Sequence, residues 1–249
     1  MDTTQIIILA AGMGKRMGGD LPKALTPLGH QSMLEHVVDT IESLGMKHSP
    51  ICVVGYKAEL VQDVLGDRVR YATQNEQKGT GHAASCAMPF IDSLVERVLI
   101  LYADQPYVSA ETIHNLIHTK QNSENSMTIA TALIEDENLF RNQFFNFGRI
   151  LRDTHGHIKS IVEAKDATDD EKQIREVNPA YFCCDIPWAI ECLKLLKNNN
   201  SQGEYYLTDL VNMAFQESHY IDSIQINERE ALGANTPEQL EVLASYLDT

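Results

Sequence analysis

No apolar run in the sequence is long enough to cross a bilayer, which takes about 20 residues in a helix. The run at residues 6–11 follows Asp2 rather than a basic segment, and it ends at Gly12. Secretory leaders begin with positive charge, so we interpret this run as a buried strand. We therefore expect a cytoplasmic protein.

Positive charge is scarce throughout the chain. Lysine and arginine total 20 against 35 aspartate and glutamate residues, and the formal net charge is −15. Such a chain repels polyanions, which argues against binding to nucleic-acid backbones or to anionic membrane surfaces. A phosphate-bearing ligand would need a local group of cations or a metal ion.

Cysteine is sparse and shows no pairing pattern. The five cysteines include no Cys-x-x-Cys, and most lie in apolar segments, so we expect reduced, buried thiols. Low-complexity tracts and fixed-period repeats are also missing. A chain of 249 residues suits one large domain with a full core.

Short apolar runs alternate with segments of helical period, which is the pattern of βα units around a parallel sheet. We predict an α/β fold with a mixed, mostly parallel sheet flanked by helices. The expected strands are residues 5–9, 50–54, 69–73, 98–101, 127–133, 148–152, 158–162, 180–184 and 221–226.

Helices are expected between these strands. The clearest one begins at Ser32, which forms a capping box with Glu35, and stops at Gly45. The predicted helices are residues 32–44, 58–65, 81–87, 110–119, 186–197, 205–217 and 237–247.

The pattern changes near residue 140. Residues 148–162 have the pattern of two strands joined through His155-Gly156-His157, a hairpin rather than a βα unit. We therefore expect one domain made of two halves, residues 1–125 and 126–230, followed by a loop and helix at 231–249. The second half would form a small substrate lobe.

A glycine-rich turn follows the first expected strand. Residues 9–17 read LAAGMGKRM, and residues 20–25 read DLPKAL. Small residues let main-chain N–H groups face a phosphate, and Arg16 and Lys23 supply local positive charge. Because Gly-Lys-Ser/Thr is absent and the third glycine is misplaced, this is neither a Walker loop nor a dinucleotide fingerprint. We predict a phosphate site; the alternative is a glycine turn with solvated lysines.

These segments resemble the signature of the sugar-phosphate nucleotidyltransferases. The resemblance is strongest to the N-terminal uridyltransferase domain of bifunctional N-acetylglucosamine-1-phosphate uridyltransferases. Further matching blocks are QNEQKGTGHA at 74–83, YAD at 102–104, FGRI at 147–150, IVEAKDAT at 161–168 and NNNSQGEYYLTD at 198–209. The resemblance implies a Rossmann-like nucleotide-diphospho-sugar transferase fold, with the nucleotide in the first half and the sugar in the second.

The resemblance also implies a reaction and its nucleotide contacts. UTP and N-acetylglucosamine 1-phosphate would give UDP-N-acetylglucosamine and pyrophosphate, with Arg16 and Lys23 on the triphosphate. Gln74 and Gly79 would read the uracil edge, because an amide and a main-chain group can complement an imide. His82 is assigned to packing or orientation. The implied nucleotide-binding residues are Leu9, Ala10, Ala11, Gly12, Gly14, Gln74, Gly79 and Thr80.

Asp104 is the candidate metal ligand. It follows the strand at 98–101, and ligands collect at the carboxyl ends of strands in open α/β sheets. A carboxylate suits Mg²⁺, which combines few protein ligands with substrate phosphates. The resemblance implies Asn235 as the second ligand; the alternative is that Asn235 caps the helix after Thr236.

The resemblance places the sugar phosphate in the second half of the chain. Carboxylates and amides suit a polyhydroxylated ring because they form several directed hydrogen bonds. The implied sugar-binding residues are Tyr102, Gly148, Glu163, Asn178, Glu204, Tyr206 and Thr208.

The chain departs from the family pattern at two small residues. Ala103 and Ala180 stand where the family commonly has glycine, and we expect both methyl groups to crowd the sugar. Hexapeptide repeats are missing, so we expect no acetyltransferase half. Transfer of a guanylyl or cytidylyl group, or a regulator that binds nucleotide sugars without catalysis, stay open as alternatives.

Overall fold

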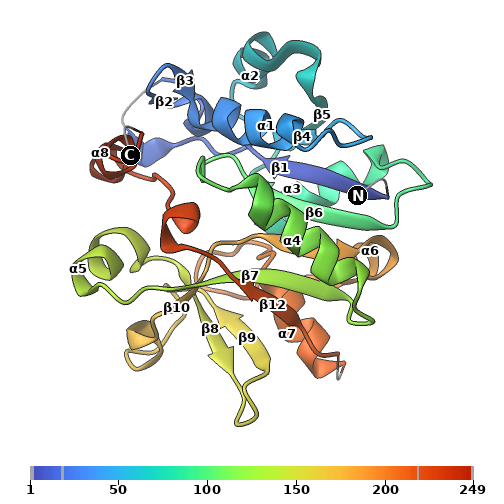
Figure 1. Ribbon diagram of the computed structural model, residues 1–249, viewed down its shortest axis with the longest axis vertical. Helices are drawn as coiled ribbons and strands as arrows, with labels where there is room; N and C mark the ends of the chain where they lie inside the picture. The colour runs from blue at the N-terminus through green and yellow to red at the C-terminus, as the bar shows by residue number, and fades with distance from the viewer. Residues whose placement is uncertain (1–2, 18–19, 218, 248–249) are drawn as a thin grey trace.

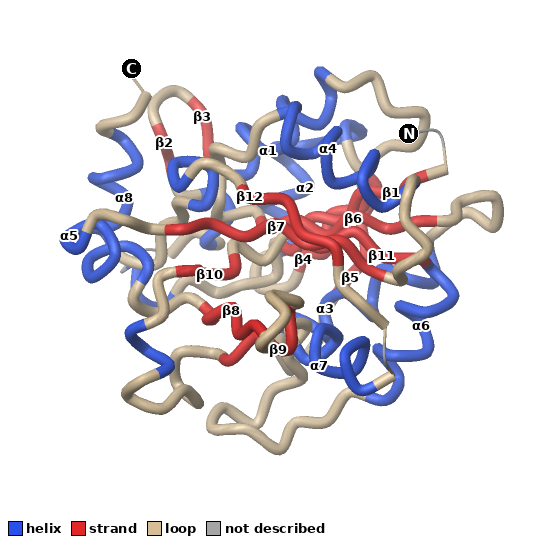
Figure 2. Tube along the Cα trace, turned by 60° about the horizontal axis from the view of Figure 1, so that its bottom comes forward, coloured by secondary structure: helices blue, strands red, loops and turns tan. Residues whose placement is uncertain are grey.

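The computed structural model describes residues 3–17, 20–217 and 219–247. One ten-stranded sheet crosses the molecule, with helices on both of its faces (Figures 1 and 2). Its strands are β1 (Thr4–Leu9), β4 (Ile51–Val54), β5 (Arg70–Thr73), β6 (Arg97–Tyr102), β7 (Met127–Leu133), β8 (Gly148–Arg152), β9 (Ile158–Val162), β10 (Glu176–Asn178), β11 (Phe182–Asp185) and β12 (Asp222–Gln225).

The strands lie in the order β5-β4-β1-β6-β11-β7-β10-β8-β9, and β12 pairs with β7. Neighbours from β5 to β6 are parallel, whereas β11, β10 and β9 run against the strands beside them. Since β12 is parallel to β7, the strands β5, β4, β1, β6, β7, β12 and β8 share one direction. The prediction of a mixed, mostly parallel sheet is confirmed.

Helices pack against the two faces of this sheet as separate groups. They are α1 (Met33–Ser43), α2 (Ala58–Leu65), α3 (Thr80–Ala87), α4 (Ala110–Gln121), α5 (Glu137–Leu139), α6 (Ile186–Leu195), α7 (Asp209–Gln216) and α8 (Pro237–Ala244). In Figure 2, α1, α2 and α4 lie above the sheet and α3, α6 and α7 below it.

β1 explains why an unbroken apolar run forms a strand here. Ile6 and Ile8 pack in the core beneath α1, α2 and α4, whereas Ile7 and Leu9 pack in the core formed with α3, α6 and α7. Side chains alternate between the faces of a strand, so a stretch of strand that packs into a core on both faces is apolar at successive positions.

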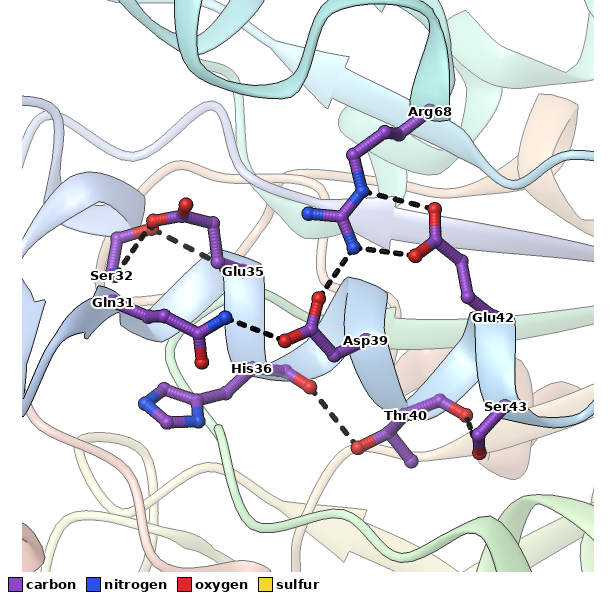
Figure 3. Close-up of polar contacts among 9 residues, drawn as sticks. All are labelled: Gln31, Ser32, Glu35, His36, Asp39, Thr40, Glu42, Ser43 and Arg68. Atoms are coloured by element: carbon purple, nitrogen blue, oxygen red, sulfur yellow. Dashed lines mark hydrogen bonds and ion pairs between the residues drawn. The ribbon is translucent and has the colours of Figure 1, made fainter.

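Helix α1 begins at the predicted capping box. The Ser32 hydroxyl accepts from the Glu35 N–H at 3.3 Å, and the Ser32 N–H donates to the Glu35 carboxylate at 2.8 Å (Figure 3). Further along, Arg68 donates to the Glu42 carboxylate at 3.0 and 2.6 Å and also pairs with Asp39. Arg68 thereby ties α1 to the turn that follows α2.

The predicted hairpin is also present. β8 and β9 pair antiparallel and project from the bottom of Figure 1. The Asp153 N–H donates to the His157 carbonyl at 2.8 Å and closes the turn between them.

Helix α7 corrects one prediction, because it begins at Asp209 rather than at residue 205. The Tyr205 N–H donates to the Lys78 carbonyl at 2.8 Å, and the Leu207 N–H donates to the Thr80 hydroxyl at 3.0 Å. These bonds hold the segment against the start of α3 and keep it out of the helix.

Short elements escaped sequence-based prediction. They are β10, α5 and a separate antiparallel ribbon of β2 (Pro27–Leu28) and β3 (Gln31–Ser32). Each has two or three residues, which is too few for a hydrophobic period to show.

The cysteines agree with the expectation of reduced thiols. All five are free and four are buried, with Cys86 partly exposed. Burial raises the pKa of Cys52 and of Cys183 to about 12, so both stay protonated at neutral pH. Within the described residues, no helix is long and apolar enough to cross a membrane.

Candidate active site

A cleft of about 220 Å³ lies where the two halves of the chain meet. Its walls come from the end of β6, the start of α3, the strands β8 to β10 and the segment before α7. The predicted site residues in its lining are Thr80, Tyr102, Asp104, Gly148, Glu163, Asn178, Glu204, Tyr206, Thr208 and Asn235.

A cluster of opposite charges closes one end of this cleft. The Lys23 ammonium contacts the Asp104 carboxylate and donates to the Asn235 amide oxygen at 2.6 Å. Arg16 donates to the same amide oxygen at 3.0 Å. Two oxygens from distant parts of the chain therefore converge on one position that already holds a cation.

The glycine-rich turn positions Lys23. The Lys23 N–H donates to the Gly12 carbonyl at 3.4 Å, and Gly14 has a φ of +64°. A Cβ at position 14 would lie 2.9 Å from the Lys23 Cβ, so the turn needs a residue without a side chain there. Gly12 is exposed and has open space around it.

The start of the turn is held by the sheet. The Ala10 N–H donates to the Val53 carbonyl at 2.9 Å, and the Leu9 carbonyl accepts from the Ala103 N–H at 3.1 Å. The Ala11 carbonyl accepts from the Gln77 side chain at 3.1 Å, which connects this turn to the segment after β5. Leu9, Ala10 and Ala11 are all buried, so only the later part of the turn is open to a ligand.

Gln74 and Gly79 lie together beside the cleft. The Gln74 carboxamide is buried, with 3% of the residue exposed, and its Nε2 donates to the Gly79 carbonyl at 3.0 Å. Nε2 also lies 3.0 Å from the Nδ1 of His82, so the His82 ring is in hydrogen-bond contact with the Gln74 side chain. Gly79 has a φ of +103°, and a Cβ there would lie 2.6 Å from the Tyr205 carbonyl.

Glu163 lines the cleft just after the end of β9. Its carboxylate accepts from the Thr208 hydroxyl at 2.9 Å. Burial and the neighbouring carboxylates of Asp166 and Asp209 raise the pKa of Glu163 above its ordinary value, although Thr208 opposes this. A carboxylate so poorly solvated gains strongly from a ligand that donates hydrogen bonds.

Several neutral groups also line the cleft. Asn178 is buried, and its Oδ1 accepts from the Ala180 N–H at 2.9 Å, whereas its amide nitrogen has no hydrogen-bond partner among the described residues. The Tyr206 hydroxyl donates to Asp166 at 3.2 Å and accepts from Gln202 at 2.7 Å. Gly148 has no room for a Cβ, which would lie 2.7 Å from Ile161.

Two further predicted residues line the cleft. Glu204 reaches the cleft from a turn whose main chain is held by the Asn200 side chain. Tyr102 lies at the end of β6, and burial raises the pKa of its hydroxyl.

A fully buried arginine supports the cleft from behind. Arg149 donates to the main-chain carbonyls of Phe145 at 2.7 Å and Lys172 at 3.3 Å, and also to those of Phe144 and Phe147. Its guanidinium lies 5.0 Å from the centre of the Phe140 ring. Arg149 therefore fixes the path of the loop that brings Phe147 and Gly148 to the cleft.

A family model described as the MobA-like NTP transferase domain matches residues 6–169, more than half of the chain. The chain belongs to the MobA-like NTP transferases. The matched region runs from β1 through β9 and includes the charged cluster up to Asp104 as well as Glu163.

Curated relatives of this NTP transferase extend the similarity to nearly its whole length. The bifunctional protein GlmU of Clostridium acetobutylicum is 40% identical over 94% of the chain, and that of Thermoanaerobacter pseudethanolicus is 41% identical over 96%. The chain spans about half the length of these relatives, 50% in each case.

Solved structures confirm the fold of this NTP transferase. A UDP-glucose pyrophosphorylase in complex with UDP-glucose superposes with a TM-score of 0.77 at 16% identity, over 98% of both chains. A Bacillus anthracis protein assigned as a glucose-1-phosphate thymidylyltransferase, solved with sucrose, gives 0.74 at 17% identity, over 99% of this chain and 97% of its own. At such identities the likeness concerns the fold.

The two alanines that replace family glycines have different environments in this NTP transferase. Ala103 is 2% exposed and packs in the core, so the expectation that its methyl group crowds the sugar is wrong. Ala180 lines the cleft and has a φ of +66°, a conformation that alanine rarely adopts. A glycine at position 180 would adopt this backbone conformation without strain.

Sequence reasoning missed several residues of the cleft lining. They are Gln105, Asn146, Phe147 and Gln202. Phe147 and Gln202 fall inside blocks that carry the family resemblance, which was a usable signal. The other two carry no signal of chemistry in their types or spacing.

Proposed function

We propose that this chain transfers a uridylyl group from UTP to N-acetylglucosamine 1-phosphate, giving UDP-N-acetylglucosamine and pyrophosphate. The observation that carries the proposal is the convergence of Lys23, Arg16, Asp104 and Asn235 at one end of a cleft. The rest of the cleft lining offers carboxylate and amide groups suited to a sugar. The choice of UTP and of this sugar rests on the resemblance of the sequence blocks.

Asp104 and Asn235 fit a divalent metal ion. Both present oxygen atoms, and both contact the Lys23 ammonium, so their shared position accepts positive charge. In the described part of the chain, no group of three or more His, Cys, Asp or Glu residues could hold a metal. Phosphate and water oxygens would complete the shell, an arrangement typical of Mg²⁺. We propose Mg²⁺, which when bound would neutralise charge on the reacting phosphates.

The chain's own residues then act by positioning and by charge. A phosphate oxygen of the sugar 1-phosphate attacks the α-phosphorus of UTP, the new P–O bond forms, and the bond to the β-phosphate breaks. The attacking phosphate is already ionised, so no general base is needed. Lys23 and Arg16 hold the triphosphate, and removing one such donor costs roughly 10²–10³ in rate.

The sugar wall is proposed to bind through directed hydrogen bonds. Glu163 accepts from a sugar hydroxyl, which compensates the poor solvation of its carboxylate. Asn178 donates from its free amide nitrogen, with Glu204 and Tyr206 beside it. We propose the corresponding division of the domain into a nucleotide half at 1–125 and a sugar half at 126–230. Its five free cysteines fit the cytoplasm, which we propose as its location.

A pyrophosphate-release assay tests this proposal. The purified chain is given each of UTP, GTP, CTP and ATP with N-acetylglucosamine 1-phosphate or glucose 1-phosphate, in the presence of Mg²⁺. We expect the highest kcat/KM with UTP and the N-acetylated sugar. Faster turnover with GTP or CTP on every sugar would overturn the base assignment. Binding of UDP-N-acetylglucosamine without turnover of any pair would indicate a regulator instead.

A further inference from the structure

The carboxamide of Gln74 has both of its N–H groups engaged inside the protein. Nε2 donates to the Gly79 carbonyl and to the Nδ1 of His82, each at 3.0 Å. Oε1 accepts no hydrogen bond from the described residues. It is not among the side-chain atoms that are both fully buried and unpaired, so it retains some access to solvent. The side chain therefore presents to a ligand an oxygen that can only accept.

The orientation of this amide follows from its two neighbours. A main-chain carbonyl cannot donate, so the Gln74 atom that faces Gly79 must be the nitrogen. Turning the amide over would place Oε1 against the Gly79 oxygen, two acceptors in contact, and His82 would have to move its ring proton to Nδ1 to keep its own hydrogen bond. Each lost bond leaves a buried group unpaired, at about 1–3 kcal/mol.

The backbone fixes both acceptors. Gly79 has a positive φ, a backbone conformation that glycine adopts without strain. Its carbonyl also accepts from the Ala83 N–H at 3.1 Å in the first turn of α3. His82 lies on that same turn. Its Nδ1 must carry a lone pair to accept from Gln74, so the ring proton sits on Nε2.

We propose that His82 is a positioning residue that selects the nucleotide base by locking the Gln74 amide. The inference rests on the proposed function, since it assigns specificity to the same nucleotide site. A fixed acceptor favours bases with a ring N–H at the facing position, which uracil, thymine and guanine carry. Cytosine and adenine have a lone pair there, and two acceptors in contact repel each other.

Three substitutions separate this role from simple packing. His82→Leu removes the acceptor, and His82→Gln places its oxygen near the former Nε2 rather than Nδ1. His82→Asn is the matched control, because its Oδ1 lies close to the position of Nδ1. For each variant, kcat/KM is measured with UTP and with CTP, and thermal melts confirm folding.

We expect the UTP-to-CTP ratio of kcat/KM to fall about tenfold in His82→Leu and His82→Gln, as the loss of one buried hydrogen bond predicts. The ratio in His82→Asn should stay within about threefold of the wild type. An unchanged ratio in a folded His82→Leu or His82→Gln variant would overturn the inference, even if both variants were less stable.

The outcome is distinguishable from failure of the proposed reaction. If the wild type releases no pyrophosphate, the same comparison is made on dissociation constants for UTP and CTP from calorimetry. If UTP binds more tightly than CTP, and this preference is lost in His82→Leu and kept in His82→Asn, the proposed role of His82 in holding the Gln74 amide is supported even without the reaction. Equal binding of UTP and CTP by the wild type overturns the lock.

Discussion

The two ends of the cleft hold their charges in opposite ways. At the proposed phosphate end, Lys23 and Asp104 pair directly and keep 14% and 22% of their side chains exposed. At the proposed sugar end, Glu163 contacts a neutral hydroxyl and lies near two more carboxylates, which with burial raise its pKa. The charges of Lys23 and Asp104 offset each other, whereas the Glu163 carboxylate would be stabilised by a further hydrogen-bond donor from a ligand.

This difference separates function from stability. Lys23 and Asp104 are partly open to solvent, and a neutral asparagine at position 104 can still accept from the Lys23 ammonium, so this substitution should leave the chain folded. A desolvated carboxylate opposes folding unless it is compensated, so a change at the sugar end should affect stability and binding together. Three substitutions test this contrast.

The largest effect is expected from Asp104→Asn. The substitution keeps the shape of the side chain and removes the charge that faces Lys23 and attracts the proposed ion. We expect turnover to fall by roughly 10² or more, with the melting temperature nearly unchanged. Initial rates over a Mg²⁺ titration, together with thermal melts, measure both quantities.

Asp169→Asn serves as the control for this substitution, because the Asp169 side chain is fully exposed and away from the cleft. Its rates should match the wild type. Wild-type turnover by Asp104→Asn at low Mg²⁺ would contradict the proposed metal site, and the role of Asn235 with it.

A smaller effect on activity is expected from Glu163→Gln. The amide oxygen can still accept from Thr208, but the sugar loses a charged acceptor, so KM for the sugar phosphate should rise about tenfold. KM for UTP should change much less. A larger rise for UTP than for the sugar would show that the two ends do not divide the substrates as proposed.

The same variant has a signature in the pH dependence of stability. The pKa of Glu163 is raised in the folded state, so the folded chain binds this proton more tightly than the unfolded chain. Wild-type stability should therefore be higher at low pH and fall as pH rises above about 4.3, the unfolded value. Glu163→Gln should lose this slope, with a melting temperature on the order of 2 °C above the wild type at pH 7.

The smallest effect is expected from Ala180→Gly, which removes the cost of a left-handed alanine. Net stabilisation of about 0.5–1 kcal/mol is expected, because glycine offsets part of the gain through its unfolded-state entropy. Ala103→Gly is the matched control and should destabilise by up to about 1 kcal/mol, since it loses a packed methyl. Melts check both, and only Ala180→Gly should alter the preference between the two sugar phosphates.

Much of the fold could be predicted because hydrophobic pattern and local signals agree. The part of β1 from Ile6 to Leu9 is apolar at every position, and the capping box of Ser32 and Glu35 marks the start of α1 in both sequence and structure. The start of α7 could not be predicted, since residues 205–208 look helical but form their hydrogen bonds with the start of α3. Tertiary contacts of that kind leave no local pattern.

The candidate site, like the fold, could be predicted from the sequence only in part. The sequence indicated Asp104, at a strand end, and Lys23, after the glycine turn, as functional residues. It did not show which residues they contact. That Lys23 meets Asn235, 212 positions later, follows from the fold alone, and only family resemblance suggested it in advance. The roles of His82 and Arg149 depend on distances between atoms, which residue types do not contain.

The cage around Arg149 has a consequence for how this cleft can evolve. The acceptors of the Arg149 hydrogen bonds are main-chain carbonyls, which every amino acid provides. Arg149 therefore fixes the path of the loop largely independently of the side chains that the loop carries. The rings of Phe140 and Phe145 are exceptions because both lie over the guanidinium, and the Phe147 ring packs against that of Phe144. Asn146, which borders the cleft, can therefore be exchanged without releasing the loop. Substitutions at position 146 should change the lining of the cleft while the loop stays anchored.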